Sequence, residues 1–269
     1  MAGDRDFNIL PDHSPRHYLR WRRVLFTCKA KEEVMFGWEG ELPAPAKRTV
    51  DEMHAVLFDP QCRCSEPLYF MYRDLARSDA DWQWLHEHQL RYDLTVIPPR
   101  DLCGEKVKTK GHYHPKNPRG VGFPEIYEVL EGEAHYLLQS CTLDDIVLIT
   151  AGAGDLVIIP PDYGHITINP SPDQTLSMAN IVSTAFESEY GKYESLHGAA
   201  YYELSEGRLV RNPAYGKVPP VRRQGASCQL GTQRICKGPL YDLIGNRDAL
   251  AFLNFPERYL PVFEALLKG

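Results

Sequence analysis

The chain has 269 residues, 25% of them charged, and a formal net charge of −6 at pH 7. Its acidic and basic residues are interspersed, which argues against nucleic acid or an anionic membrane surface as the main partner. No apolar run approaches the roughly 20 residues that span a bilayer, and the first residues lack the apolar segment of a secretory signal. We therefore expect a cytoplasmic protein.

Residues 1–46 are mixed in character and basic around "RHYLRWRR". We expect this N-terminal extension to contribute a strand or a helix that wraps a core. The stretch "ELPAPAKR" at its end is expected to be a linker, because Pro43 and Pro45 break any helix.

The chain carries β signals from residue 50 to about residue 212. Runs rich in aromatic and β-branched residues predict strands, and glycine or proline turns separate them. The expected strands lie within residues 66–75, 91–99, 125–130, 133–139, 145–150, 151–161 and 166–183. Short strands separated by frequent turns predict a mainly β sandwich or barrel.

Two segments of the chain are expected to be helical. "SDADWQWLHEHQ", residues 78–89, has Ser78 as its expected N-cap. From about residue 238 the apolar spacing in "NRDALAFLN" and "PERYLPVFEALLK" predicts a helical tail. We expect the tail, joined by a polar linker, to dock on the barrel or on a second subunit. The expected domain organisation is thus 1–46, 47–217 and 218–269.

The seven cysteines are scattered in the sequence, and an odd number without paired spacings does not make the disulfide framework of a small secreted domain. Cys62 and Cys64 are one residue closer than the C-x-x-C spacing of zinc and redox sites, so we expect plain thiols there. The full set is Cys28, Cys62, Cys64, Cys103, Cys141, Cys228 and Cys236.

Three histidines and a glutamate have the spacing of a metal site. His112 and His114 point to one face if they lie on a strand, and Glu125 begins the next strand. His165 follows a proline turn at the start of another strand. Imidazoles with one carboxylate suit Fe, Ni, Cu and Zn. The alternative is that these are polar strand residues without a metal, but burying them together would then be costly.

The spacings from Glu125 to Gly132 and from Gly154 through Pro160 and His165 resemble the two-part signature of the cupin superfamily. That resemblance implies a double-stranded β-helix, or jelly-roll barrel, in which three histidines and one glutamate hold a metal. A second H-x-H, His86 and His88, is expected on a helix, where residues two apart do not face each other.

A closer resemblance is to the archaeal-type cupin phosphoglucose isomerases. It is carried by "TKGHYH", "EIYEVLEGEAHYLLQ" and "PPDYGHITIN", with weaker matches such as "RNPAYGK", and covers roughly residues 47–217. The resemblance implies that His112, His114, Glu125 and His165 bind one divalent metal ion per subunit, with Fe²⁺ favoured over Mn²⁺, Ni²⁺, Co²⁺ or Zn²⁺. It also implies that Glu125 and Tyr127 are catalytic. The positions that match the substrate site are Tyr69, Thr95, Thr109, Gly111, Tyr127 and Tyr190.

Thr109 and Gly111 precede the first ligand, where a hydroxyl and a backbone N–H can hold a phosphate. Lys110 between them can equally well be a phosphate contact or a solvated side chain. Each tyrosine can equally well line the substrate site or be a strand aromatic that packs in the core. The chain departs from the family in two places. Ten residues, "PKNPRGVGFP", separate His114 from Glu125 where about six are usual, which predicts a longer loop over the pocket mouth. Val182 and Ser188 stand where a tyrosine and a histidine are common.

The resemblance implies an aldose–ketose isomerase that interconverts glucose 6-phosphate and fructose 6-phosphate in glycolysis and gluconeogenesis. Two alternatives stay open: an Fe(II) oxygenase or other cupin enzyme, and a non-catalytic cupin that binds sugar phosphates. Cupins of this kind commonly pair through edge strands, so a homodimer is expected unless the helical tail caps that edge.

Overall fold

The structure is a computed structural model that describes residues 42–226, 229–230, 233–234 and 239–268. The expected N-terminal element within residues 1–41 lies outside the described residues. The strands are β1 (Ala46–Arg48), β2 (Tyr69–Tyr72), β3 (Leu90–Ile97), β4 (Glu125–Glu131), β5 (Glu133–Ser140), β6 (Ile146–Gly152), β7 (Leu156–Ile159), β8 (Tyr163–Ile168), β9 (Leu176–Ser183), β10 (Tyr201–Glu203), β11 (Leu209–Arg211), β12 (Arg222–Gly225), β13 (Gln229–Leu230) and β14 (Gln233–Arg234).

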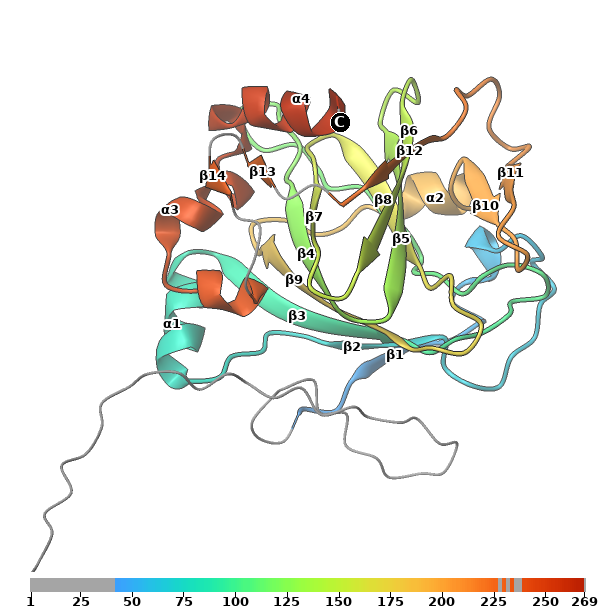
Figure 1. Cartoon of the computed structure of the whole chain (residues 1–269), viewed down its shortest axis with the longest axis horizontal. Coiled ribbons are helices and arrows are strands. Elements are labelled where there is room, and N and C mark those ends of the chain that lie inside the picture. Colours follow the sequence, from blue (N-terminus) through green and yellow to red (C-terminus); the bar gives the residue numbers. More distant parts are fainter. Residues whose placement is uncertain (1–41, 227–228, 231–232, 235–238, 269) are drawn as a thin grey trace, which may run out of the picture.

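The helices are short and lie outside the sheets (Figure 1). The α-helices are α1 (Asp79–Glu87), α2 (Gly191–Ser195), α3 (Arg247–Leu250) and α4 (Leu260–Lys268). The 3₁₀ helices are η1 (His54–Val56), η2 (Leu240–Leu243), η3 (Ala251–Leu253) and η4 (Pro256–Arg258).

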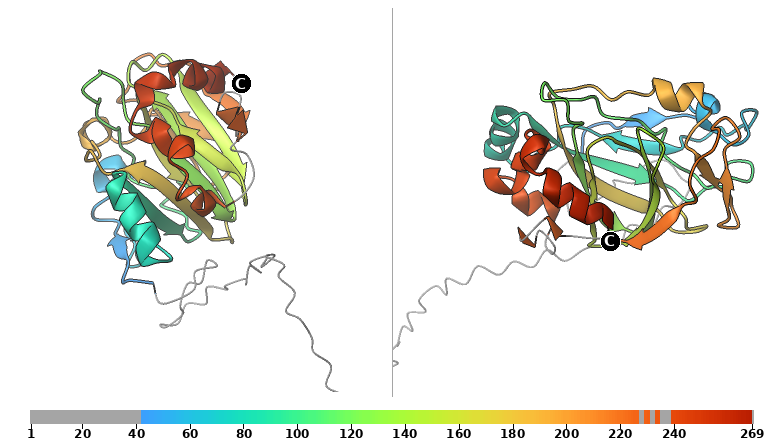
Figure 2. Two further views of the ribbon diagram at one scale, coloured as in Figure 1. Left: turned by 90° about the vertical axis from the view of Figure 1, so that its left-hand side faces the viewer. Right: turned by 90° about the horizontal axis from the view of Figure 1, so that it is seen from above.

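Two facing sheets form the body of the molecule (Figures 1 and 2). One has the strand order β1-β2-β3-β9-β4-β7, and the other has the order β12-β6-β5-β8. The predicted mainly β jelly roll is therefore confirmed. Strand pairing in the described residues does not close the two sheets into a continuous barrel. The main core includes apolar side chains of both sheets, such as Val129, Tyr136, Ile166 and Met178.

The β4–β5 connection carries the chain from one sheet to the other. Gly132 makes this turn with a φ of +81°, and a Cβ there would lie 2.6 Å from the Thr175 carbonyl oxygen. Only glycine adopts this backbone conformation at so close an approach without strain. The sequence signal at Glu131-Gly132 thus marks the crossing point of the jelly roll.

Helix α1 begins as the sequence predicts. The Ser78 hydroxyl oxygen accepts a hydrogen bond from the Asp81 backbone N–H at 3.1 Å, which satisfies one donor of the first turn. Leu85 is buried, while the histidines of the helix bond locally: His86 to Asp74 and His88 to the Trp84 carbonyl oxygen.

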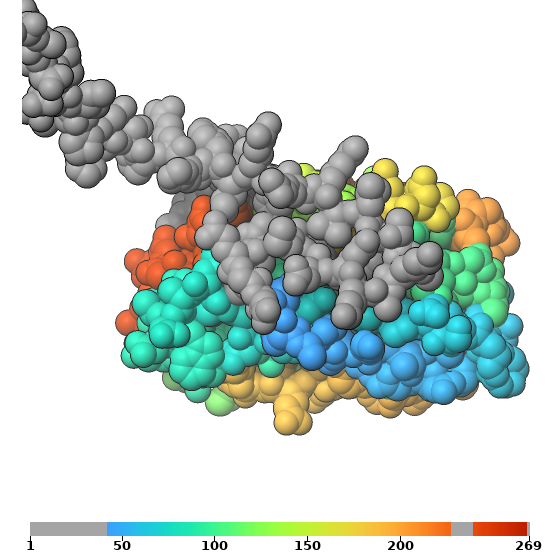
Figure 3. Space-filling view, turned by 90° about the horizontal axis from the view of Figure 1, so that it is seen from below, coloured from blue at the N-terminus to red at the C-terminus, as the bar shows by residue number. Residues whose placement is uncertain are grey.

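The C-terminal tail docks on the same chain, along the β4–β7 side of the sheets (Figure 2), and its first part lies beside the segment that carries α1 (Figure 3). Leu250, Phe252 and Phe263 are buried in a second core with residues of β3, β4 and β9. The Leu240 backbone N–H donates to Glu128 at 2.7 Å, and Asn254 donates to the His88 carbonyl oxygen at 2.7 Å. The tail thus packs against the sheets of its own chain, one of the two arrangements that the sequence predicted.

Three features differ from the sequence expectations. Residues 46–48, expected at the end of a linker, form β1, which pairs antiparallel with β2. Residues 222–225, expected in a linker, form β12, which pairs in parallel with β6. Cys62, expected to be a plain thiol, forms a disulfide bond with Cys103, whereas Cys64 and Cys141 are free. Spacing along the chain did not reveal this pair, because 41 residues separate its two members. Within the described residues, no helix has the length and apolar content needed to cross a membrane.

Candidate metal centre

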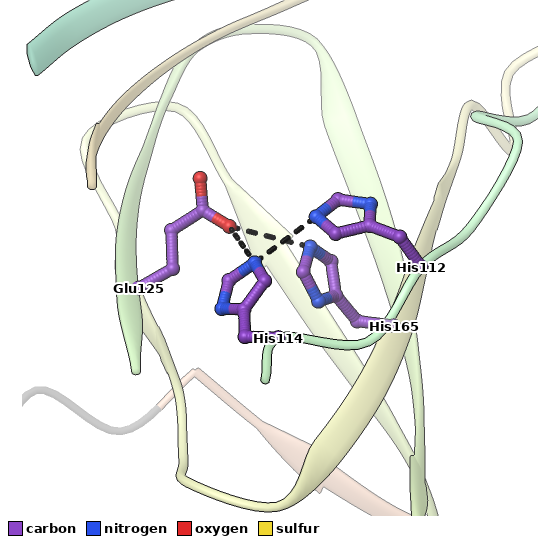
Figure 4. Close-up of side chains that lie close together, drawn as sticks. All are labelled: His112, His114, Glu125 and His165. Carbon is purple, nitrogen blue, oxygen red and sulfur yellow. Dashed lines mark hydrogen bonds and ion pairs between the residues drawn. The ribbon is translucent and has the colours of Figure 1, made fainter. Parts of the chain in front are cut away.

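Four side chains from three segments converge between the two sheets (Figure 4). Glu125 opens β4 in the larger sheet, and His165 lies on β8 in the smaller one. His112 forms an isolated β-bridge with His165, which anchors the extended segment that also carries His114. His112 and His114 thus reach His165 because the segment that carries them pairs with the edge strand β8.

The potential ligand atoms are close enough to share one ion, since they all lie within 4.8 Å of one another. His112 Nε2 is 3.0 Å from His114 Nε2. Glu125 Oε2 is 3.4 Å from His114 Nε2 and 3.5 Å from His165 Nε2. Neutral nitrogens and a carboxylate oxygen at these separations surround one point in space, as a divalent cation requires.

Two neighbours orient the cluster. His114 Nδ1 lies 2.8 Å from the Phe123 carbonyl oxygen, so Nδ1 carries the proton and Nε2 presents its lone pair to the cluster. Asn180 on β9 donates to Glu125 Oε1 at 2.7 Å and leaves Oε2 directed at the histidines. Such partners fix the tautomer and the rotamer of metal ligands.

Two polar atoms of the cluster are buried without a partner in the described residues: Glu125 Oε2 and His165 Nδ1. A buried carboxylate oxygen without a hydrogen bond costs roughly 1–3 kcal/mol or more. A cation bound by Glu125 Oε2 would remove that cost. The residues present therefore fit a divalent metal ion.

Burial sets the protonation of the cluster. It lowers the pKa of His114 to about 4, and it lowers the pKa values of His112 and His165 well below their usual range. Burial raises the pKa of Glu125 to about 8. Near neutral pH the histidines are therefore neutral and ready to coordinate, and the carboxyl group must lose a proton to bind a cation.

The segment before the first ligand is shaped by close packing. Gly111 has a φ of +82°, and a Cβ there would lie 2.4 Å from Ile166 Cγ2 and 2.8 Å from the Tyr193 ring. The Thr109 hydroxyl oxygen accepts a hydrogen bond from the Thr167 backbone N–H at 2.9 Å. This residue pattern thus bends the chain against β8 so that His112 reaches the cluster.

A cavity of about 420 Å³ opens beside the group formed by His112, His114, Glu125 and His165, which we call the metal cluster. Every residue that the resemblance assigned to the substrate site lines it: Tyr69, Thr95, Thr109, Gly111, Tyr127 and Tyr190. Val182 and Ser188 line it too, so both departures from the family face the cavity.

The sequence reasoning missed several polar residues of this wall, namely Arg48, Arg73, Arg91 and Asn180. Strand alternation could have placed Arg73 with Tyr69, and Arg91 with Thr95, on one face. Lys110, for which two interpretations were open, lines the cavity and pairs with Glu194 at 2.6 Å.

The longer loop between His114 and Glu125 is tied to the C-terminal tail. Asn117 is buried and donates to Glu257 of η4 at 3.0 Å. The same loop supplies the Phe123 carbonyl oxygen that orients His114. His86 on α1 and His88 just after it take no part. The described residues contain one group of three or more potential metal ligands, the four named above.

Comparison with known sequences identifies relatives of the region that carries the site. A family profile described as glucose-6-phosphate isomerase matches residues 47–220. The glucose-6-phosphate isomerase of Thermococcus gammatolerans is 30% identical over 132 residues, which are 48% of this chain and 66% of that protein. That of Pyrococcus furiosus is 29% identical over 133 residues, 49% of this chain and 67% of that protein. The chain thus spans just under two thirds of the first of these relatives.

Comparison with solved structures finds more distant likenesses. An oxalate oxidase structure superposes with a TM-score of 0.37 and 16% identity, covering 50% of this chain and 61% of that one. An oxalate decarboxylase from Bacillus subtilis gives a TM-score of 0.33 and 12% identity, covering 55% of this chain and 32% of that one. Scores this low say nothing about function.

Proposed function

The chain belongs to the glucose-6-phosphate isomerase family, and from this premise we propose that it is a metal-dependent isomerase of glucose 6-phosphate and fructose 6-phosphate. The observation that carries the proposal is the position of the metal cluster. It forms part of the wall of a cavity of about 420 Å³ whose other walls include each residue that the resemblance assigned to the substrate.

One end of the cavity suits a phosphate. The Tyr69 hydroxyl oxygen accepts hydrogen bonds from Arg48 Nε at 3.2 Å and from the Lys110 backbone N–H at 3.2 Å. Two donors occupy both lone pairs, so the phenolic proton is available to an acceptor in the cavity. Arg48 and Lys110 place cationic N–H donors beside Thr109 and Gly111, each held by its own carboxylate, and together these groups would hold the phosphate of the sugar.

His112, His114, Glu125 and His165 would hold the metal ion. When bound, a divalent ion supplies Lewis acidity that polarises a substrate carbonyl and acidifies the neighbouring C–H bond. Fe²⁺ is our first choice, with Mn²⁺, Ni²⁺, Co²⁺ and Zn²⁺ as alternatives, because a mixed imidazole and carboxylate site accepts all of them.

Glu125 and Tyr127 are the groups that can act on the sugar. Glu125 is the candidate base for moving a proton between C1 and C2 through a cis-enediol. A carboxylate engaged by a cation is a weakened base, so it would have to free one oxygen first. The Tyr127 hydroxyl, 3.2 Å from His165 Nε2, would hold a sugar hydroxyl or relay the proton.

A hydride shift between the two carbons is the alternative to the enediol. Turnover in deuterated water distinguishes the two routes. Deuterium at C2 of the recovered aldose indicates the enediol and Glu125 as base, whereas its absence indicates the hydride shift.

An assay of the purified chain tests the proposed activity. Fructose 6-phosphate conversion is measured on the protein as isolated, after chelation, and after each divalent ion is returned. We expect activity that chelation removes and one or more of these ions restores. No conversion under any condition would contradict the proposal and favour a non-catalytic sugar-phosphate protein, which the loss of a tyrosine and a histidine at Val182 and Ser188 would explain.

A homodimer and a cytoplasmic location in glycolysis and gluconeogenesis complete the proposal. Light scattering of the purified chain tests the dimer. A reducing cytoplasm would hold Cys62 and Cys103 as thiols, so thiol labelling in cells tests the location.

A further inference from the structure

Positive charge is distributed unevenly around the cavity. At the end near β1, each cation has its own carboxylate: Arg48 lies 3.0 Å from Glu52, and Lys110 lies 2.6 Å from Glu194. These pairs balance their charges one to one. Arg73, just after β2, and Arg91, on β3, are not paired one to one with carboxylates in this way.

Arg73 and Arg91 share a single carboxylate. Arg73 Nη1 lies 2.6 Å from Asp93 Oδ2, and Arg91 Nε lies 2.9 Å from Asp93 Oδ1. The Asp74 backbone N–H also donates to Asp93 at 3.0 Å. The Asp93 side chain is fully buried, whereas 43% of the Arg73 side chain and 35% of the Arg91 side chain remain exposed. Asp93 therefore balances only one of these two positive charges, and both arginines line the cavity together with Glu125 and Glu187.

The two arginines differ in how many donors they use. Arg73 donates from Nη1 to Asp93 and from Nη2 to Met71 Sδ at 3.2 Å. Arg91 bonds to Asp93 only through Nε, and its Nη1 and Nη2 have no hydrogen-bond partner within the described part of the chain. A guanidinium whose terminal N–H groups are unused can bind a two-oxygen anion in bidentate fashion.

Strand register places this pair beside the metal cluster. Across the sheet, Asp93 is paired with Asn180, and Asn180 is paired with Tyr127. In the next row Arg91 is paired with Val182, and Val182 with Glu125. Neighbouring strands are about 4.8 Å apart, so Arg91 starts two strand spacings from Glu125. Val182, which stands between them in the register, lines the cavity as both of these residues do.

The arginine pair is also at a useful distance from the phosphate end. Tyr69 and Arg73 point to the same face and are four residues apart, which is about 13 Å along an extended strand. This separation is comparable to the length of an open-chain six-carbon sugar phosphate. A ligand with its phosphate near Tyr69 would bring its C1–C2 end toward Arg73 and Arg91.

We propose that Arg73 and Arg91, held in place by Asp93, form an oxyanion-binding pair for the C1–C2 end of an open-chain sugar phosphate. The inference rests on the proposed function and names a part of the site that the family resemblance did not supply. When the C–H proton leaves carbon, its electron pair moves onto the carbonyl oxygen, and the pair stabilises the resulting negative charge by hydrogen bonds. The arginines transfer no proton and form no covalent bond. A ligand with a carboxylate at C1 places the same charge there permanently.

The test compares two ligands that differ only at C1: a phosphorylated six-carbon aldonate and the corresponding phosphorylated alditol. Calorimetry on chelated protein measures both dissociation constants without metal and without turnover. We expect the wild-type chain to bind the aldonate about 10- to 100-fold more tightly, as charge-assisted hydrogen bonds predict. Arg91→Gln should abolish this preference and leave the alditol constant unchanged.

Arg91→Gln leaves Asp93 with Arg73 and the Asp74 N–H, so the buried carboxylate keeps partners. Arg91→Lys is the second variant should the first fail to fold, and it should keep a reduced preference because lysine lacks the planar fork. Arg208→Gln, which removes an exposed pair with Glu206, is the control and should bind as the wild type does.

Each outcome separates the two proposals. A preference for the aldonate that survives Arg91→Gln, or an equal loss for both ligands, overturns the arginine pair and leaves the isomerase proposal standing. Binding of neither ligand to the chelated wild-type chain overturns the arginine pair, and the fructose 6-phosphate assay of metal-loaded protein then decides on the isomerase. An arginine-dependent preference in a chain without isomerase activity supports the oxyanion pair and removes the activity.

Discussion

Two buried polar groups in this molecule differ in how many of their atoms find partners. The Asn212 side chain is 1% exposed, donates to the carbonyl oxygens of Leu196 and Ala199, and accepts from the Ala214 N–H. In the metal cluster, Glu125 and His165 are 3% and 2% exposed, yet Glu125 Oε2 and His165 Nδ1 have no hydrogen-bond partner among the described residues.

The difference separates a structural group from a candidate binding group. Asn212 closes a loop and leaves nothing for a ligand to satisfy. In the metal cluster a buried carboxyl oxygen, Glu125 Oε2, lacks a hydrogen bond, and a bound cation would satisfy it. Asn180 combines both features: it is a buried amide, 2% exposed, and it donates its hydrogen bond to Glu125 of the metal cluster.

The largest effect should come from removing a ligand. His112→Ala takes away one of four donors and should weaken divalent metal binding by more than about 100-fold, since even changes outside the ligand set cost 10- to 100-fold. Calorimetric titration of chelated protein measures the affinity. Metal affinity equal to that of the wild type would place the ion elsewhere.

Asn180→Leu should have the next largest effect. It removes the donor that holds Glu125 Oε1 at nearly constant side-chain volume, so the carboxylate loses its orientation. We expect metal affinity to fall about 10- to 100-fold. The same titration checks this, with the unfolding temperature as evidence that the variant folds.

The pH dependence of metal binding should follow one carboxyl group. Burial raises the pKa of Glu125 from 4.5 to about 8, and it lowers the pKa of His114 to about 4. Between about pH 5 and 8 the metal-free cluster therefore carries a proton on Glu125 and none on His114. Binding must release that proton, so the apparent affinity should rise about tenfold per pH unit and level off above about pH 8. Calorimetry in buffers of different ionisation enthalpy counts the proton, and affinity independent of pH would contradict this assignment.

The smallest effect on metal affinity should come from Asn212→Leu, the matched variant of Asn180→Leu. It leaves two carbonyl oxygens and a backbone N–H without their partner and should lower the free energy of unfolding by about 1–3 kcal/mol. Metal affinity should stay within about twofold, because Asn212 shares no bonding partner with the ligands. Urea unfolding and metal titration report the two effects separately.

The sequence predicted that the four side chains of the cluster meet, because each stands at a fixed spacing from a turn. His112 and His114 alternate on an extended segment, Glu125 precedes Gly132, and His165 follows a proline turn. The Ser78 cap and the Gly132 turn were also readable, because both depend on residues within a few positions of one another.

Contacts that depend on strand order could not be read in the same way. Arg73 and Asp93 meet because β2 pairs with β3, and alternation alone does not say which strands are neighbours. The polar β12 carries no apolar alternation to mark it as a strand, yet it completes the edge of a sheet beside β6. The Cys62–Cys103 pair likewise depends on how two loops fold together.

The most direct measurement of the central claim is anomalous diffraction from crystals of the chain loaded with Zn²⁺. The account predicts one strong peak per chain, about 2.0–2.2 Å from nitrogens of His112, His114 and His165 and from an oxygen of Glu125. A cluster without a peak at full loading, or a peak bound by other side chains, would contradict it.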